Sequence, residues 1–377
     1  MNQLKILFTG DFCPQLRIAE LVEQERYDLI FNDFKKELEG NDFNVVDLEC
    51  PLTERTSTIH KTGPHLKASP KAIKSLTYAG VNVAAMANNH IKDYGSEGLL
   101  ETVQDCLAAG IKTVGVGAGL EAARTPLYVE AKGIKIAILN MTENEWSNTH
   151  GAEAGANPLD LVKNFNDIRD ARQKNDFVIV IFHGGNEFYE LPSPRIKETF
   201  RFFVDAGASA VIGHHTHIVS GYEIYKQAPI FYSLGNFCFD WPGQRSSFWN
   251  IGFSVRLKLA KDHEVTFDIL PFKQNDEVAG VHSLSDQEVE KFKTNMSRLN
   301  AIIADDQLLS DKFDAFCKEK RIIYEIYMEP YRNTLLASLY KRGLFPSFFS
   351  KQKKRLHLNI MRCESHRDVL MEMLKKE

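Results

Sequence analysis

The feature that most constrains the fold of this sequence is a set of apolar runs that each end directly in polar side chains. There are five such runs: KILFTGD (residues 5–11), NVVDLE (44–49), VAAMANNH (83–90), VIVIFHGG (178–185) and AVIGHHTH (210–217). Short runs rich in Val and Ile are typical of strands, and an unbroken apolar run indicates a fully buried one. Amphipathic stretches with helical spacing, among them 69–79 and 194–206, alternate with these runs. This alternation predicts an α/β fold.

The polar residues at the ends of the five runs form a candidate metal site. In open α/β sheets, ligands bind outside the carboxyl ends of the strands. If the strands are mostly parallel, the five ends meet at one edge. Taken singly, each polar residue has an ordinary explanation as a helix cap, a turn residue or a buried histidine. Together they are too many for one tetrahedral ion and include a carboxylate able to bridge, so we expect two ions among Asp11, Glu49, Asn89, His90, His183, His215 and His217.

The last of the five runs has the densest group of potential ligands. It contains three histidines within four positions, His214, His215 and His217. In extended backbone the side chains of His215 and His217 would point the same way and that of His214 elsewhere. Adjacent imidazoles favour Zn, Mn or Fe over Mg or Ca. The alternative interpretation is a solvated loop that is rich in histidine.

Size and composition limit the other classes of function. The chain has 377 residues and a formal net charge of −4, so no basic face indicates nucleic-acid binding. Six cysteines lie scattered without CxxC spacing, which favours a reducing, cytoplasmic setting over a disulfide framework. The apolar stretch before Asp11 predicts a first strand rather than a signal peptide. No window approaches the roughly 18 apolar residues of a membrane span.

Strand patterns disappear near residue 284 and helical spacing follows. We therefore expect a boundary near residue 280, with the main domain at 1–280 and a helical extension at 281–377. Residues 344–358, LFPSFFSKQKKRLHL, combine aromatic rings with a basic run. Such a segment can contact an anionic membrane surface peripherally. The alternative is a helix that packs on the protein with its charges in water.

The motifs TGD, DLE, ANNH, HGG, GHHTH and SLGNF occur in this order. In this order they resemble the CapA/PgsA family of capsule and poly-γ-glutamate biosynthesis proteins, within the calcineurin-like metallophosphoesterase superfamily. The resemblance covers roughly residues 4–240. It implies a four-layer α/β/β/α sandwich with a dinuclear metal site, to which the helical C-terminal extension is added.

The resemblance also implies roles for individual residues. Asp11 would bind one metal, Glu49 would stand at the position of the bridging carboxylate, and Asn89 would bind the second metal. His90 would be the acid near the leaving group. His183, His215 and His217 would complete the two coordination shells, while Asn236 and His214 are further candidates to line the site.

The sequence departs from the superfamily pattern at two places. Cys13 stands where many members have a histidine, and Glu49 stands where the second aspartate is usual. Cys13 is either a thiolate ligand or a buried structural thiol.

Two functions remain open on these grounds. The first is a metal-dependent phosphoesterase or related hydrolase of surface-polymer biosynthesis that acts on an anionic small molecule or polymer. The second is a non-catalytic, metal-binding component of a polymer synthesis or export machinery. His90 favours the hydrolase, because a structural site needs no acid beside its metals.

Overall fold

The computed structural model describes residues 3–261, 265–328 and 333–362. The chain divides into two compact units, Met1–Ser310 and Asp311–Glu377. The first unit thus runs past the boundary near residue 280 that the composition predicts. It does so because Phe292 and Met296 of helix α9 (Asp286–Ala304) belong to the hydrophobic core of the sheets.

The first sheet has eight strands, and a parallel part of it carries the motifs of the N-terminal half. Its order is β16-β15-β14-β1-β2-β3-β4, with β13 also paired to β1. Strands β1 to β4 and β13 pair with one another in parallel, while β14 pairs antiparallel with β1, and β15 and β16 continue this antiparallel part. The bounds are β1 Leu4–Cys13, β2 Phe43–Leu48, β3 Val83–Ala85, β4 Lys112–Val114, β13 Asn236–Phe239, β14 Ile251–Leu259, β15 Val265–Gln274 and β16 Val281–Ser283.

The second sheet has six strands in the order β11-β12-β10-β9-β7-β6. Its four central strands are parallel and its two edge strands are antiparallel to their neighbours. The bounds are β6 Leu127–Ala131, β7 Ile134–Thr142, β9 Phe177–His183, β10 Ala210–His214, β11 Tyr222–Tyr225 and β12 Ala228–Phe231. A separate two-stranded pair joins β5 (Val116–Gly117) and β8 (Gly155–Ala156).

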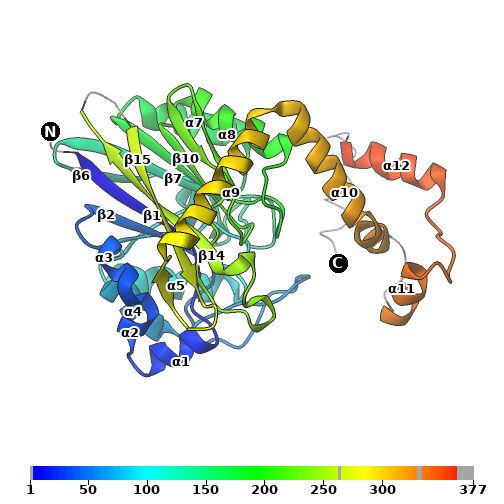
Figure 1. Cartoon of the computed structure of the whole chain (residues 1–377), viewed down its shortest axis with the longest axis horizontal. Coiled ribbons are helices and arrows are strands. Elements are labelled where there is room, and N and C mark those ends of the chain that lie inside the picture. The colour runs from blue at the N-terminus through cyan, green and yellow to red at the C-terminus, as the bar shows by residue number, and fades with distance from the viewer. Residues whose placement is uncertain (1–2, 262–264, 329–332, 363–377) are drawn as a thin grey trace. The chain divides into compact units, whose positions relative to one another are not determined.

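The alternation of side chains along each strand produces the layers. Ile6 and Phe8 of β1 pack in the core between the two sheets, whereas Leu7 packs against helices on the outer face. Val45 and Val46 of β2 divide in the same way. Helices cover both outer faces, with α1 to α4 on one side of the strands and α7 and α8 on the other (Figure 1). The predicted four-layer α/β/β/α arrangement is confirmed.

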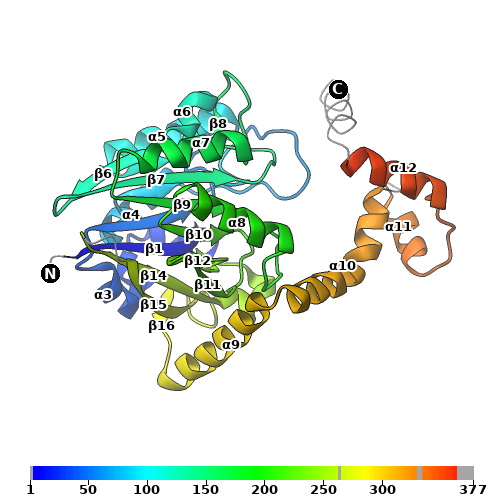
Figure 2. The ribbon, with the colours of Figure 1, turned by 90° about the horizontal axis from the view of Figure 1, so that it is seen from above.

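The helices of the first unit begin and end where the sequence provides caps. The bounds are α1 Arg17–Glu23, α2 Tyr27–Phe31, α3 Lys35–Leu38, α4 Ile73–Ala79, α5 Gly95–Ala108, α6 Leu120–Arg124, α7 Leu161–Arg172 and α8 Pro194–Ala206. Ser193 caps α8 by accepting a hydrogen bond from the N–H of Ile196 at 3.2 Å, and Pro194 fits the first helical position. Gly207, at φ 121°, then ends α8 and the chain enters β10. Figure 2 shows α8 beside the strands that carry the histidines.

The second unit is helical, as the composition predicts. It contains most of α10 (Asp306–Met328), together with α11 (Thr334–Lys341) and α12 (Lys351–Arg362). Glu325 of α10 accepts hydrogen bonds from Lys354 Nζ at 2.7 Å and Arg321 Nε at 2.9 Å, which ties α12 to α10. None of the helices in the described ranges is long and apolar enough to cross a bilayer.

Candidate metal centre

The ends of the parallel strands place the polar motifs opposite one another between the two sheets. In the first sheet, Asp11 of β1 is in register with Asp47 of β2 on one side and Asn236 of β13 on the other. In the second sheet, His183 of β9 is in register with His214 of β10. All five residues are at most 2% exposed. The predicted convergence of strand ends is therefore present, although it joins two sheets rather than the edge of one.

Asp11 reaches this site through an irregularity in β1. Ile6 and Phe8 face the second sheet, so strict alternation would turn Asp11 to the opposite face. The register of β1 shifts between Phe8 and Asp11, which brings the carboxylate inward. Gly10 permits the close approach of the residue that precedes β13, because a Cβ at position 10 would lie 1.9 Å from the carbonyl oxygen of Gly235.

The three histidines of GHHTH differ from the extended arrangement that we expected. Strand β10 ends at His214, whose side chain follows the inward pattern of Ala210 and Ile212. Its Nδ1 lies 2.8 Å from Asp11 Oδ1, so the expectation that His214 points away from the site is wrong. His215 and His217 have φ values of 92° and 62°, a left-handed backbone that turns both imidazoles into the site.

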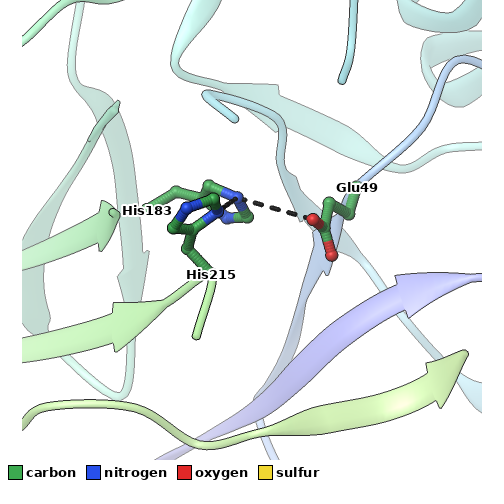
Figure 3. A group of neighbouring side chains, drawn as sticks. All are labelled: Glu49, His183 and His215. Atoms are coloured by element: carbon green, nitrogen blue, oxygen red, sulfur yellow. Dashed lines mark hydrogen bonds and ion pairs between the residues drawn. The ribbon is translucent and has the colours of Figure 1, made fainter. Parts of the chain in front are cut away.

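Three overlapping groups of side chains in the described residues have ligand atoms within 4.8 Å of one another. They are Glu49 with His183 and His215, Asp11 with Glu49 and His217, and Asp11 with Asp47 and His214. Figure 3 shows the first group, in which His183 and His215 lie side by side facing the carboxylate of Glu49. Glu49 belongs to the first and second groups, the arrangement that a carboxylate bridging two ions requires.

Asn89 adds an oxygen to the first group. Its Oδ1 lies 3.0 Å from His183 Nε2, and His215 Nδ1 lies 3.2 Å from the same nitrogen. Asn88 fixes this loop: its amide donates to Leu48 O at 2.8 Å, and its oxygen accepts from the N–H of His90 at 3.1 Å. The side-chain amide of Asn89 is thus held beside the rings of His183 and His215.

The buried carboxylates provide a direct test of whether a cation fits. Both side-chain oxygens of Glu49 and Oδ1 of Asp47 are buried without a hydrogen-bond partner. The imidazoles nearest to Glu49 Oε1 are at 3.6 Å (His183 Nε2) and 3.7 Å (His217 Nε2), too far for hydrogen bonds. Buried carboxylates are normally paired, or they coordinate metals. The donor set therefore fits divalent cations, and the imidazoles favour Zn, Mn or Fe.

The pKa values of these carboxylates follow from burial and mutual repulsion. Burial, joined by the charge of Asp11, raises the pKa of Asp47 to about 8 and that of Glu49 well above its usual range. Burial also acts to raise the pKa of Asp11, but its hydrogen bonds with His214 and His217 outweigh this and hold that pKa below its ordinary value. A cation among them would favour the ionised form of all three.

The imidazoles divide into two kinds. Burial lowers the pKa of His183 and is the main cause that lowers the pKa of His215 to about 3, so both rings are neutral as metal ligands must be. The pKa values of His217 and His214 are raised despite burial. For His217 the cause is its hydrogen bond with Asp11, and for His214 it is the nearby charges of Asp47 and Asp11. Asp47 Oδ2 accepts from His183 Nδ1 at 3.1 Å, which leaves Nε2 directed at the first group.

His90 is held beside the centre by a buried ion pair. Its Nδ1 lies 2.7 Å from Asp93 Oδ2 and 3.1 Å from Lys61 Nζ, and Lys61 also pairs with Asp93. Burial lowers the pKa of His90, and its hydrogen bond with Asp93 opposes that shift. With Nδ1 engaged by Asp93, Nε2 is the nitrogen left for proton transfer.

Every predicted site residue lies in this part of the structure, and one neighbour was overlooked. Asn236 Oδ1 lies 3.0 Å from His217 Nδ1, which places Asn236 beside that ring. Asp47 was not among the predicted ligands, although the period of two in DLE places it on the same face as Glu49. Cys13 lies in the core beneath the outer helices, where burial and its hydrogen bond with Cys50 raise the pKa of the thiol. It belongs to none of the ligand groups in the described residues.

Comparison with known proteins identifies a family whose model matches this chain. A family model described as "Bacterial capsule synthesis protein PGA_cap" matches residues 5–241. The capsule biosynthesis protein CapA of Bacillus anthracis is 31% identical over 248 residues, which cover 63% of this chain and 60% of that protein. The PGA biosynthesis protein CapA of Bacillus subtilis is 29% identical over 274 residues, covering 71% of each chain.

A further relative and a solved structure were also found. A probable polyglutamine synthesis accessory protein of Mycobacterium tuberculosis is 29% identical over 220 residues, covering 54% of this chain and 57% of that protein. The crystal structure of TT1561 of Thermus thermophilus aligns with a TM-score of 0.36 at 10% identity, covering 71% of this chain and 99% of that one.

Proposed function

Because the chain belongs to the bacterial capsule synthesis protein PGA_cap family, we propose that it is a metal-dependent phosphoesterase of capsule or poly-γ-glutamate biosynthesis. The observation that carries the proposal is that two groups of buried ligands share Glu49. Two ions in such a site, of Mn, Zn or Fe, supply Lewis acidity and lower the pKa of water.

We assign the ligands to the two ions as follows. Asp11, Glu49 and His217 would hold one ion, and Glu49, Asn89, His183 and His215 would hold the other. Asp47 keeps His183 oriented through Nδ1. The substrate would be an anionic phosphoester, since the charge that two divalent ions bring is suited to phosphoryl oxygens.

His90 would donate the proton to the leaving oxygen. Asp93, at 2.7 Å, fixes the ring and stabilises the imidazolium that gives this proton up. Lys61, which also pairs with Asp93, moderates that stabilisation because its charge lowers the pKa of His90. General acid catalysis of this kind contributes roughly 10²–10⁴-fold to the rate.

The test is hydrolysis of bis(4-nitrophenyl) phosphate by protein stripped with a chelator and reloaded with Mn²⁺. We expect turnover that depends on the added metal and is lost in Glu49→Gln, while Glu121→Gln retains it. Glu121 is a matched control, because its side chain is 85% exposed on α6. Stoichiometric metal binding without turnover of any phosphoester would instead support the non-catalytic, metal-binding component of a synthesis or export machinery.

A further inference from the structure

Aromatic rings adjoin the candidate metal centre on the side of His217. The ring of Trp249 is 4.7 Å from that of His217, and the ring of Phe188 is 6.2 Å from it, measured between centroids. Phe188 and Trp249 are stacked at 5.8 Å with an interplanar angle of 24°. Trp241 lies 6.3 Å from Trp249. We call Phe188, Trp241 and Trp249 the aromatic platform.

Two of the three rings of the platform are open to solvent. Phe188 is 47% exposed and Trp241 is 38% exposed, while Trp249 is buried beneath them. Burial of an aromatic side chain stabilises the folded state, so exposed rings forgo much of this stabilisation. The exposed rings adjoin a cluster of buried polar groups, the combination found in ligand sites.

The backbone at Phe188 is strained in a way that holds this ring in place. Its φ is 59°, in the left-handed region that bulky residues rarely adopt. The N–H of Phe188 donates to the carbonyl oxygen of Thr216 at 3.0 Å, which joins its loop to the histidine loop. Such strain persists only where the surroundings enforce it, and it is concentrated at binding sites.

The charges around the platform limit what can lie on it. Glu187 is exposed and directly precedes Phe188. The cations of two neighbouring loops already have acidic partners: Lys61 pairs with Asp93, and Arg195 pairs with Glu143. A polyanion would meet repulsion from Glu187, whereas hydroxyl groups could donate hydrogen bonds to its carboxylate.

We propose that the aromatic platform is a subsite for a sugar ring, and that the substrate is a phosphoester of a pyranose. The apolar face of the ring would stack on Phe188, its hydroxyl groups would donate to Glu187, and its phosphoryl group would extend to the metal centre. The platform thus selects the substrate, and the proposal rests on the phosphoesterase function given above.

The kinetic test compares two phosphomonoesters, glucose 1-phosphate and glycerol phosphate, with Mn²⁺-loaded protein. In Phe188→Ala we expect the ratio of kcat/KM for glucose 1-phosphate to that for glycerol phosphate to fall about tenfold, mainly through KM. Phe188→Trp should restore the ratio, and Tyr128→Ala, which removes an exposed ring on β6, should leave it unchanged. An equal loss for both substrates in Phe188→Ala would overturn the proposal.

A binding test separates the platform from catalysis. Tryptophan fluorescence of protein that is not turning over is titrated with glucose 1-phosphate and, separately, with a γ-linked glutamate oligomer. We expect the sugar phosphate to change the fluorescence, with affinity about tenfold weaker in Phe188→Ala and reduced in Glu187→Gln. No response to the sugar phosphate in the wild type, or tighter binding of the oligomer than of the sugar phosphate in the wild type, would overturn the subsite. Sugar binding without turnover of any phosphoester would retain the subsite and reject the phosphoesterase.

Discussion

At the residue scale, the tautomers of the site are set by the neighbours of each imidazole. Asp47 occupies Nδ1 of His183, and Asp93 occupies Nδ1 of His90. In each case Nε2 is left for the functional contact. The same arrangement would prepare His183 to bind a metal and His90 to transfer a proton.

The separate role of His90 leads to the first prediction. His90→Ala should lower the turnover of an alkyl phosphodiester about 10²–10⁴-fold, because it removes the proposed donor of the proton that an alkoxide leaving group needs. Its metal content should remain that of the wild type, since His90 belongs to none of the ligand groups in the described residues. Steady-state kinetics and elemental analysis of the same preparation provide the two readouts. Full activity in the variant would remove His90 from the mechanism.

At the scale of single elements, the register shift in β1 determines where Asp11 points. We predict that Gly10→Ala destabilises the protein by about 3 kcal/mol, because its Cβ would lie 1.9 Å from Gly235 O. Gly151→Ala is the matched control, since a Cβ there meets no atom within 4 Å, and its effect should stay within about 0.5 kcal/mol. Urea unfolding measures both. Equal stability of the two variants would show that β1 tolerates the substitution.

The elements also show which parts of the site could be predicted from sequence. Apolar runs ending in polar residues predict parallel strands, and parallel strands bring Asp11, Glu49 and His183 together without further information. The alternation of side chains along a strand also predicts that Asp47 of DLE lies on the same face as Glu49. The shifted register of β1 and the left-handed backbone at His215 could not be predicted, because both depend on contacts with strands far away in the sequence.

At the scale of the whole molecule, metal binding should depend on pH. The pKa of Asp47 is raised to about 8 and those of Glu49 and His217 are also raised, so these groups hold protons that a cation must displace. The pKa of Asp47 is higher in the folded than in the unfolded state. Its contribution to metal-free stability is therefore present below about pH 4 and is lost as the pH rises towards 8.

The measurement that follows is the change in Tm on adding Mn²⁺ at pH 6 and at pH 8. We expect the larger increase at pH 8, where fewer protons compete with the ion. His183 and His215, whose pKa values are lowered, do not oppose this trend because their rings are neutral at both pH values. A larger increase at pH 6 would contradict the assignment of the buried carboxylates as ligands.

The second unit has a charge pattern of its own. Residues 334–362 contain seven Lys and Arg and no Asp or Glu, against a net charge of −4 for the whole chain. Leu356 and Leu358 of α12 are 56% and 58% exposed, close to this basic run. Apolar side chains beside basic ones favour an anionic membrane surface, so peripheral contact there stays a prediction.

Flotation with liposomes tests this prediction. The intact chain should float with vesicles that contain phosphatidylserine and stay behind with purely zwitterionic ones. A variant with Lys351→Glu, Lys353→Glu and Arg355→Glu should lose the effect, as should high salt. If the wild type does not float with the anionic vesicles, α12 is a helix whose charges face water.

The central claim is that strand ends from two sheets jointly bind a pair of cations, and the number of ions per chain tests it most directly. Elemental analysis of protein saturated with Mn²⁺ and then freed of excess metal should give about two ions per chain. Glu49→Gln should reduce this number below one, because Glu49 belongs to both groups. No bound metal in the wild type, or an unchanged number in Glu49→Gln, would contradict the account.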